Sequence, residues 1–242
     1  MKKSVVLVLT AMMLVMAGPG GISKTAFAAD VTAGTDFVSA YVWRGITFND
    51  AIVAQPYIDV ASGGFGINIW GNMDIDDYDD TRDSGEFSEL DLTLSHGFSL
   101  DPVDVGLGYI EYLFPAGVEG TREVFLGMSV EWMAGFSSGI TGYYDFDEVN
   151  DYYMNASVGY DHDFANGVGL GLGAEAGFSG DDASAGKDGG FHEYLLSVDC
   201  SYPVTEAAEM SAFMAWADNF DKDVLPDQDT DLFGGIGISV SF

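Results

Sequence analysis

The sequence has few basic residues, one cysteine and, after its first 30 residues, no long apolar segment. Only 8 Lys and Arg stand against 39 Asp and Glu. Three of the 8 (Lys2, Lys3 and Lys24) precede residue 30 and no acid does, which leaves 5 bases against 39 acids, a formal charge of −34. Because like charges repel, nucleic acid and anionic lipid are poor partners for such a surface. The single cysteine, Cys200, excludes an internal disulfide framework.

The first 29 residues have the layout of a secretory signal peptide. Lys2 and Lys3 precede an apolar run over 5–17, and small residues at 26–29 offer a cleavage site. The run is shorter than the roughly 20 apolar residues that a spanning helix needs. We therefore expect residues 1–29 to be removed on export and residues 30–242 to form one domain. An exported chain without spanning helices can still enter a bilayer as a closed β-barrel.

Alternation of apolar and polar residues recurs about twelve times after residue 33, as expected for two-faced strands. Each segment is long enough for a tilted membrane strand of roughly 9–11 residues. Tight turns alternate with longer loops such as 74–86, which is the asymmetry of outer-membrane barrels. The sequence therefore predicts an all-β transmembrane antiparallel barrel of about 12 strands, with short periplasmic turns and longer acidic extracellular loops. A secreted β-sandwich is the alternative. The expected strands are 34–44, 52–61, 64–74, 87–98, 103–113, 121–132, 136–146, 151–162, 167–178, 191–202, 207–217 and 232–242.

The segment 232–242 shows the two faces most clearly. Ile236, Ile238 and Val240 share one parity, glycines and serines fill most of the other, and the segment ends on Phe242, like the closing strand of bacterial outer-membrane barrels. Aromatic residues on the apolar parity of the other strands cluster at strand ends, which predicts two interfacial girdles. The expected girdles are Phe65, Phe98, Trp132, Phe136, Phe164, Tyr202 and Phe242 at the periplasmic edge, and Trp43, Tyr109, Tyr144, Tyr152 and Trp216 at the outer edge.

The segment Phe37–Gly45, with Ser39, Tyr41 and Arg44 in it, resembles the opening of the TorF-like porins, a family of bacterial outer-membrane barrels. The resemblance continues through Gln55-Pro56 and through Trp-Gly-Asn-Met-Asp at 70–74. It covers roughly the first quarter of the exported chain, and the remainder is similar in strand pattern only. The resemblance implies a barrel and a channel, and it implies no catalytic residue. The acidic loops of this sequence are not part of the family pattern.

Acidic residues dominate the parity expected to face the barrel interior. One inward base, Arg44, cannot neutralise ten inward acids. Because an unpaired ionised carboxylate costs several kcal/mol to bury dry, the lumen is expected to hold water and cations. The lumen residues expected to set selectivity are Arg44, Asp59, Glu89, Asp91, Asp104, Glu123, Glu131, Asp145, Asp161, Glu175 and Asp199.

This wall predicts a passive, porin-like channel for small cationic or neutral solutes, with no enzyme activity, cofactor or metal. Inward glycines such as Gly108 and Gly171 would leave room for a narrow passage. The alternative is a barrel plugged by a carboxylate network, Arg44 and folded-in loops, which would make it a structural or adhesive protein. The expected partners are outer-membrane lipid, lipopolysaccharide and small solutes or cations.

Two acidic loops and three histidines are the remaining candidates for chemistry. Loops 74–86 and 218–231 carry the oxygen ligands that calcium favours, but without the spacing of a helix–loop–helix site. Solvated acidic loops screened by divalent cations are the simpler interpretation. His96, His162 and His192 fall on the outward parity near strand ends, and no Gly-x-Ser-x-Gly motif is present. The sequence therefore gives no catalytic triad.

Overall fold

The computed structural model describes residues 29–76, 84–115, 117 and 119–242. The expected signal peptide up to residue 28, and residues 77–83 of the first acidic loop, lie outside the described residues. Within the described ranges, no helix is long and apolar enough to cross a membrane.

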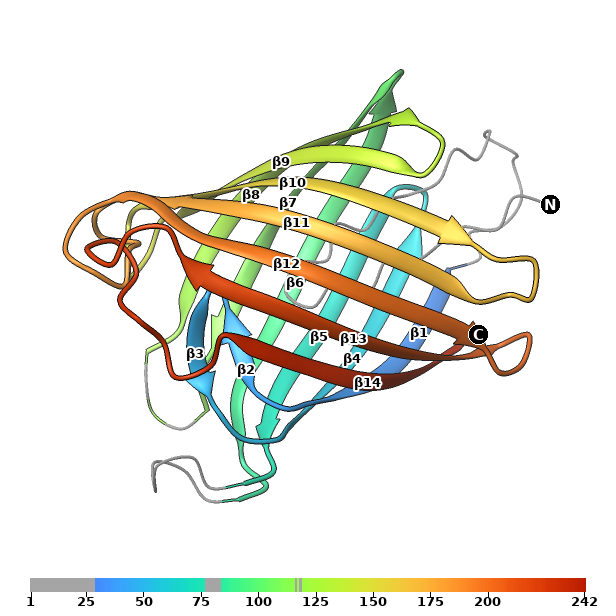
Figure 1. The fold of residues 1–242 in the computed structure, drawn as a ribbon, viewed down its shortest axis with the longest axis horizontal. Helices are drawn as coiled ribbons and strands as arrows, with labels where there is room; N and C mark the ends of the chain where they lie inside the picture. Colours follow the sequence, from blue (N-terminus) through green and yellow to red (C-terminus); the bar gives the residue numbers. More distant parts are fainter. Residues whose placement is uncertain (1–28, 77–83, 116, 118) are drawn as a thin grey trace.

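Twelve antiparallel strands form the wall of a closed barrel (Figure 1). The first wall strand pairs with the last through Thr32–Ser241 to Val38–Gly235, and on its other edge with the next wall strand, so the sheet has no free edge. The predicted all-β barrel is therefore confirmed. The wall strands are β1 (Asp30–Val38), β4 (Val53–Ser62), β5 (Phe65–Asp74), β6 (Phe87–Leu100), β7 (Val103–Leu113), β8 (Thr121–Met133), β9 (Phe136–Asp145), β10 (Tyr152–Asp163), β11 (Gly169–Ser179), β12 (Gly190–Pro203), β13 (Ala208–Asn219) and β14 (Leu232–Ser241).

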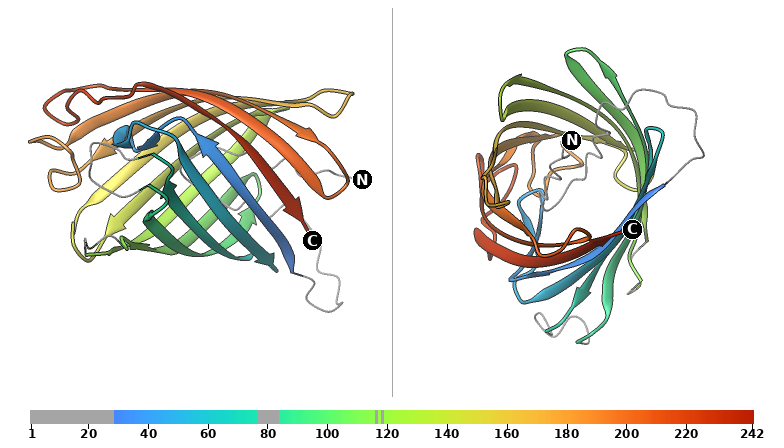
Figure 2. Two further views of the ribbon diagram at one scale, coloured as in Figure 1. Left: turned by 90° about the horizontal axis from the view of Figure 1, so that it is seen from below. Right: turned by 90° about the vertical axis from the view of Figure 1, so that its right-hand side faces the viewer.

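The two ends of the barrel differ in the length of their connections. At the end that carries the chain terminus, the Phe242 amide bonds to the Val31 carbonyl, and two residues, Gly63 and Gly64, suffice to join β4 to β5. Both glycines have positive φ, as a two-residue hairpin turn requires. The opposite end carries the long connections, including 180–189 and 220–231 (Figure 2). Short turns face the periplasm in outer-membrane barrels, so the long loops are extracellular.

The outer surface of the wall is apolar. Ile69, Leu126 and Val158 point outward from the middle of their strands and are exposed on the barrel exterior. Exposed aromatic side chains lie at the strand ends, where interfacial girdles belong: Phe65, Trp132, Tyr202 and Phe242 at the periplasmic end, and Tyr144, Tyr152 and Trp216 at the outer end. Because a surface of this kind is stable against lipid and not against water, the wall spans a membrane.

Two adjacent residues of β10 test this assignment of faces. Val158 is 55% exposed on the exterior, whereas Ser157 pairs with Gly139 and Glu175 on the interior parity. Val158→Arg is expected to lower the free energy of unfolding by about 2–4 kcal/mol, because it places a charge in lipid near the bilayer midplane. Ser157→Arg, the control, is expected to cost about 1 kcal/mol or less because its charge enters the lumen beside Glu175. Urea unfolding in lipid vesicles measures both, and equal losses would contradict the assignment.

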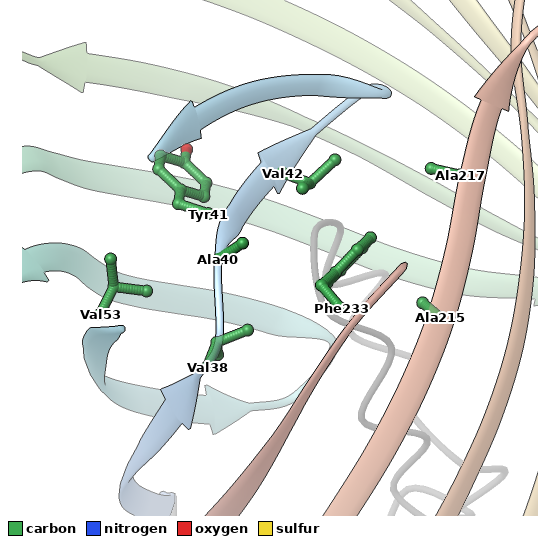
Figure 3. Packing of buried hydrophobic residues seen from close by; sticks show 8 residues of the cluster. All are labelled: Val38, Ala40, Tyr41, Val42, Val53, Ala215, Ala217 and Phe233. Atoms are coloured by element: carbon green, nitrogen blue, oxygen red, sulfur yellow. The ribbon is translucent and has the colours of Figure 1, made fainter. Parts of the chain in front are cut away.

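The predicted first strand, 34–44, is wrong in its second half. β1 ends at Val38, and the chain then leaves the wall to form a separate hairpin of β2 (Tyr41–Trp43) and β3 (Ile46–Asn49) inside the barrel (Figure 1). The physical reason is that Ala40, Tyr41 and Val42 are apolar on both parities, whereas a wall strand has one lipid-facing side. Inside the barrel they pack in one buried cluster (Figure 3). The cluster comprises Val38, Ala40, Tyr41, Val42, Val53, Ala215, Ala217 and Phe233.

Candidate functional site in the barrel lumen

The tip of the β2–β3 hairpin is a two-residue turn, Arg44–Gly45. Both residues have positive φ, 49° and 75°, which is the backbone of a type I′ turn. Glycine adopts this conformation freely and arginine does not, so surrounding contacts must hold Arg44 in place. The turn directs the Arg44 side chain away from the hairpin stem and toward the opposite wall.

Position 45 also has no room for a side chain, which is a second reason for glycine there. A Cβ atom at this position would lie 2.7 Å from Cβ of Glu193 and 2.9 Å from Cδ2 of Leu225. Gly85 has a similar φ of 88°, and no atom of the described residues lies within 4 Å of such a Cβ, so it serves as the matched control. Gly85→Ala is expected to cost about 1–2 kcal/mol for the left-handed backbone alone. Gly45→Ala is expected to cost more by urea unfolding, because the tip must also move from β12; equal costs would refute this close approach.

Arg44 binds a site made by the far wall. Its two terminal nitrogens donate to the two carboxylate oxygens of Glu123 at 2.8 and 2.7 Å, with both side chains less than 10% exposed. The guanidinium carbon lies 4.1 Å from the ring centroid of Trp43, 4.9 Å from that of Tyr143 and 4.2 Å from that of Tyr153. A bidentate pair combined with cation–π contacts is a strong and directional arrangement.

The hairpin crosses the lumen. In the order of strands around the barrel, β9 is six neighbours from β1 in either direction, so it lies opposite the strand from which the hairpin departs. Arg44 reaches Glu123 of β8, Tyr143 of β9 and Tyr153 of β10. From the outside, Thr47 bonds to Gln228 and Thr230 of the 220–231 loop. The hairpin therefore narrows the lumen near its extracellular end.

A second contact ties the hairpin stem to β6. The Tyr41 hydroxyl donates to Oε2 of Glu89 at 2.7 Å. Asp91, the next residue on the same face, lies half-buried beside Glu89 and Glu123, and its buried Oδ1 has no hydrogen-bond partner among the described groups. Arg44 is thus surrounded by more acid than it can neutralise.

His192 does not lie where its parity predicts. β12 bulges opposite Gly177, between the pairs Ala176–Tyr194 and Phe178–Phe191, so His192 turns inward beside Glu193, which already stands on the inward parity. Nδ1 of His192 lies 2.7 Å from Oε2 of Glu193, and the Tyr153 hydroxyl donates to Oε1 of the same carboxylate. Nε2 of His192 is buried and has no hydrogen-bond partner in the part of the chain that the structure describes. The outward position predicted for His192 is therefore wrong.

Trp43 is also misplaced by the prediction of an outer girdle. It sits in the lumen, stacked on Arg44 and edge-on to Tyr112 at a centroid distance of 6.0 Å. The reason is again that β2 is not a wall strand. The girdle prediction assumed that residue 43 ended a strand facing lipid.

Several predicted lumen acids are held by neighbours. Asp59 accepts from Asn68 at 2.9 Å, and Glu175 accepts from Asn155 at 2.9 Å. Asp145 is buried at the outer end, where it accepts from the Thr121 hydroxyl and from the backbone amides of residues 147 and 149. Asp145 therefore fixes the β9–β10 loop.

The other predicted acids lie nearer the periplasmic end. Asp104 bonds to Ser99 beside one short turn, and Glu131 accepts from the Gly135 amide at another. Asp161 of β10 is near Asp199 of β12 and Glu131 of β8, each of which lies one intervening strand away. We call Glu131, Asp161 and Asp199 the periplasmic acid layer. The other bases of the described chain, Arg122, Lys187 and Lys222, are exposed outside the lumen, so none of them neutralises this layer.

The inward glycines do not simply leave open space. A Cβ atom at Gly108 would lie 2.5 Å from the ring of Phe125, and one at Gly171 or Gly177 would collide with the carboxylate of Asp199 or Glu193. These glycines accommodate side chains of adjacent strands that lie flat on the wall. The prediction that glycines such as Gly108 and Gly171 open the passage is therefore wrong at these positions.

Sequence reasoning missed the tyrosines that surround Arg44. Tyr112 donates to Oε2 of Glu123 at 2.9 Å, and Tyr143 and Tyr153 are buried against the guanidinium. The sequence did contain a signal for them, because these tyrosines stand on the inward parity. Large aromatic rings are not expected on the wall of a water-filled lumen. Glu193 was missed although it shares the inward parity of Leu195 and Asp199; only the inward turn of His192 depends on the bulge, which is not visible in the sequence.

No protein-family model and no curated protein matches the sequence. Solved structures do match. The KdgM porin, solved in complex with disordered oligogalacturonate, superposes with a TM-score of 0.57 at 10% identity, over 88% of this chain and 99% of that chain. An outer-membrane channel from Pseudomonas putida F1 superposes with a TM-score of 0.57 at 11% identity, over 94% of this chain and 100% of that chain. The NanC porin superposes with a TM-score of 0.51 at 12% identity, over 88% of this chain and 98% of that chain.

The fold is that of outer-membrane porins. At these identities the likeness establishes the fold alone, and together with the apolar exterior it places the chain in the outer membrane. The TorF-like family is not confirmed by any matching family model, and it stays a prediction. Among the described residues, no group of three or more His, Cys, Asp or Glu side chains is arranged to hold a metal ion. Residues 77–83 of the first acidic loop lie outside that search.

Proposed function

We propose that this barrel is a passive outer-membrane channel that admits small cations in preference to anions. The observation that supports it is the charge of the lumen: in the described chain its only lysine or arginine is Arg44, whose charge Glu123 already neutralises, and His192 is paired with Glu193. The remaining acids, foremost the periplasmic acid layer, form a wall of one sign. Rings of carboxylates raise the local concentration of cations and exclude anions.

The lumen charge distinguishes this barrel from a structural neighbour that binds an acid. The KdgM porin was solved with oligogalacturonate, a carboxylate-bearing oligomer. Asp161 and Asp199 of this chain would repel such a ligand, because they have no basic partner among the described residues of the lumen. The hairpin across the lumen also favours small ions over oligomers. Lipid and lipopolysaccharide remain the partners proposed for the exterior and the loops.

Neutralising the periplasmic acid layer tests this function. The double substitution Asp161→Asn with Asp199→Asn is expected to lower the cation-to-anion permeability ratio several-fold, measured from reversal potentials in planar bilayers. The control is Asp227→Asn, because Asp227 is exposed on the last loop and pairs with Lys222 at 2.7 Å. A permeability ratio unchanged by the double substitution would show that these acids do not select ions.

The hairpin gives a specific reason to keep a second candidate, a non-conducting structural or adhesive barrel. From the β1 side of the lumen, the hairpin reaches Glu89 of β6 through Tyr41 and Glu123 of the facing wall through Arg44. If the folded, membrane-inserted protein passes no current with the hairpin in place, this second function is the one to adopt.

A further inference from the structure

The wall around Arg44 is a complete receptor for a guanidinium group without the hairpin. Glu123 supplies two carboxylate oxygens in one plane, and Tyr143 and Tyr153 supply aromatic faces. These groups come from β8, β9 and β10, three consecutive wall strands. A carboxylate fork with aromatic faces matches the planar guanidinium better than a compact ammonium ion.

Each wall group is oriented by a partner of its own. The Tyr112 hydroxyl holds Glu123 at 2.9 Å, and Glu193 accepts from the Tyr153 hydroxyl. The rings of Tyr143 and Tyr153 contact each other with centroids 6.2 Å apart. A receptor fixed in this way loses little freedom when a ligand binds, which favours affinity.

Arg44 fills this receptor imperfectly. Its backbone has a φ of 49°, which is unfavourable for a residue with a side chain. Its Nε is buried and has no hydrogen-bond partner among the described groups. A free guanidinium compound carries neither constraint, so it is able to compete with the tethered group.

We propose that Glu123, Tyr143 and Tyr153 form a guanidinium-binding subsite, which Arg44 occupies as a tethered ligand and which guanidinium-bearing solutes enter in its place. A role of this subsite in channel selectivity rests on the proposed function. The binding of guanidinium to the subsite does not depend on it. Because binding removes Arg44 from Glu123, it also releases the hairpin tip from the far wall. The lumen would thus widen for the class of solute that it recognises.

Competition with a tethered group sets the expected affinities. A short flexible tether gives an effective concentration of about a millimolar, and a rigid hairpin gives more. A soluble guanidinium therefore binds the native protein weakly and binds a protein without Arg44 more tightly. The probe is methylguanidinium chloride, titrated by calorimetry into the folded barrel in detergent, with methylurea as the neutral analogue of similar shape.

Arg44→Ala is expected to bind methylguanidinium at least tenfold more tightly than the native protein, and adding Glu123→Gln is expected to abolish that gain. Arg44→Gln is the second variant, because it removes the charge while keeping a long side chain on the hairpin. Arg122→Ala removes an exposed arginine that pairs with Glu111, and it should leave the affinity of the native protein for methylguanidinium unchanged. Equal affinity in the native protein and both Arg44 variants, or a gain that survives Glu123→Gln, would overturn the subsite.

The calorimetric result is independent of conduction. A barrel that binds methylguanidinium in this pattern but passes no current retains the subsite and loses the proposed channel. A barrel that conducts cations but shows no gain in the Arg44 variants retains the channel and loses the subsite.

Discussion

Removing the β2–β3 hairpin is expected to raise the single-channel conductance several-fold. Val38 and Val53 are direct partners in the β1–β4 pairing, so Asn-Gly can replace residues 39–52 and join the two strands by an ordinary type I′ turn. The wall stays closed because β1 keeps its pairing with β4 and β14. The deletion removes Tyr41, Trp43 and Arg44, the residues that cross the lumen in the native protein.

The control for this deletion shortens a loop that does not enter the lumen. The Asp145 amide bonds to the Asp151 carbonyl, so Asn-Gly can replace residues 146–150 of the β9–β10 connection. Both shortened proteins should fold, as judged by heat-modifiable migration on gels. Native conductance in the folded hairpin deletion would show that the hairpin does not limit the passage.

Glu123→Gln is expected to lower the free energy of unfolding by about 3–5 kcal/mol, because it leaves the buried guanidinium of Arg44 without a counter-charge. The chain offers a matched exposed pair. Arg122 and Glu111 lie 3.2 Å apart with side chains 47% and 29% exposed. Glu111→Gln is expected to cost about 1 kcal/mol or less, since water solvates the arginine that remains.

Replacing both buried partners by apolar residues separates the cost of burial from the value of the pair. Arg44→Met with Glu123→Leu is expected to recover much of the stability that Glu123→Gln loses, because neither charge is then left in the protein interior. Urea unfolding in vesicles compares the three proteins. If Glu123→Gln costs no more than Glu111→Gln, the Arg44–Glu123 pair is hydrated, and the hairpin is not fixed to the far wall by it.

The wall could be predicted because lipid and lumen impose opposite chemistry on alternate residues. In β8, Val124, Leu126 and Met128 face the exterior while Glu123 and Phe125 face inward, and a shift by one residue would put the carboxylate in lipid. This constraint repeats on each wall strand. The strand limits therefore follow from the sequence to within one or two residues, except in the first.

The first strand could not be predicted because the pattern there does not choose between lipid and a lumen core. Tyr41 and Trp43 suit an interfacial girdle as well as they suit the hairpin. The Arg44–Gly45 turn is short enough to be read as the end of a strand. Only the closed ring shows that a strand continuing through residue 44 would extend beyond its partner, since β4 begins opposite Val38.

The partners of the lumen acids could not be predicted either. Glu123 binds a residue 79 positions away, and Tyr153 binds Glu193 from a different strand. Such contacts depend on the order of strands around the ring, and the contact of His192 with Glu193 depends also on the bulge opposite Gly177, which turns His192 inward. Inward parity placed Asp145, Asp161 and Asp199 in the lumen, but it did not distinguish Asp145, which holds a loop, from Asp161 and Asp199, which lie close together near the periplasmic end.

The most direct test of a cation-preferring channel is the reversal potential of the native protein in a planar bilayer under a gradient of potassium chloride. Because the lumen is acidic, the reversal potential is expected to have the sign set by the potassium gradient. The unitary currents are expected to be small because the hairpin narrows the passage. A reversal potential set by chloride, or a folded and inserted barrel that carries no current, would contradict the account.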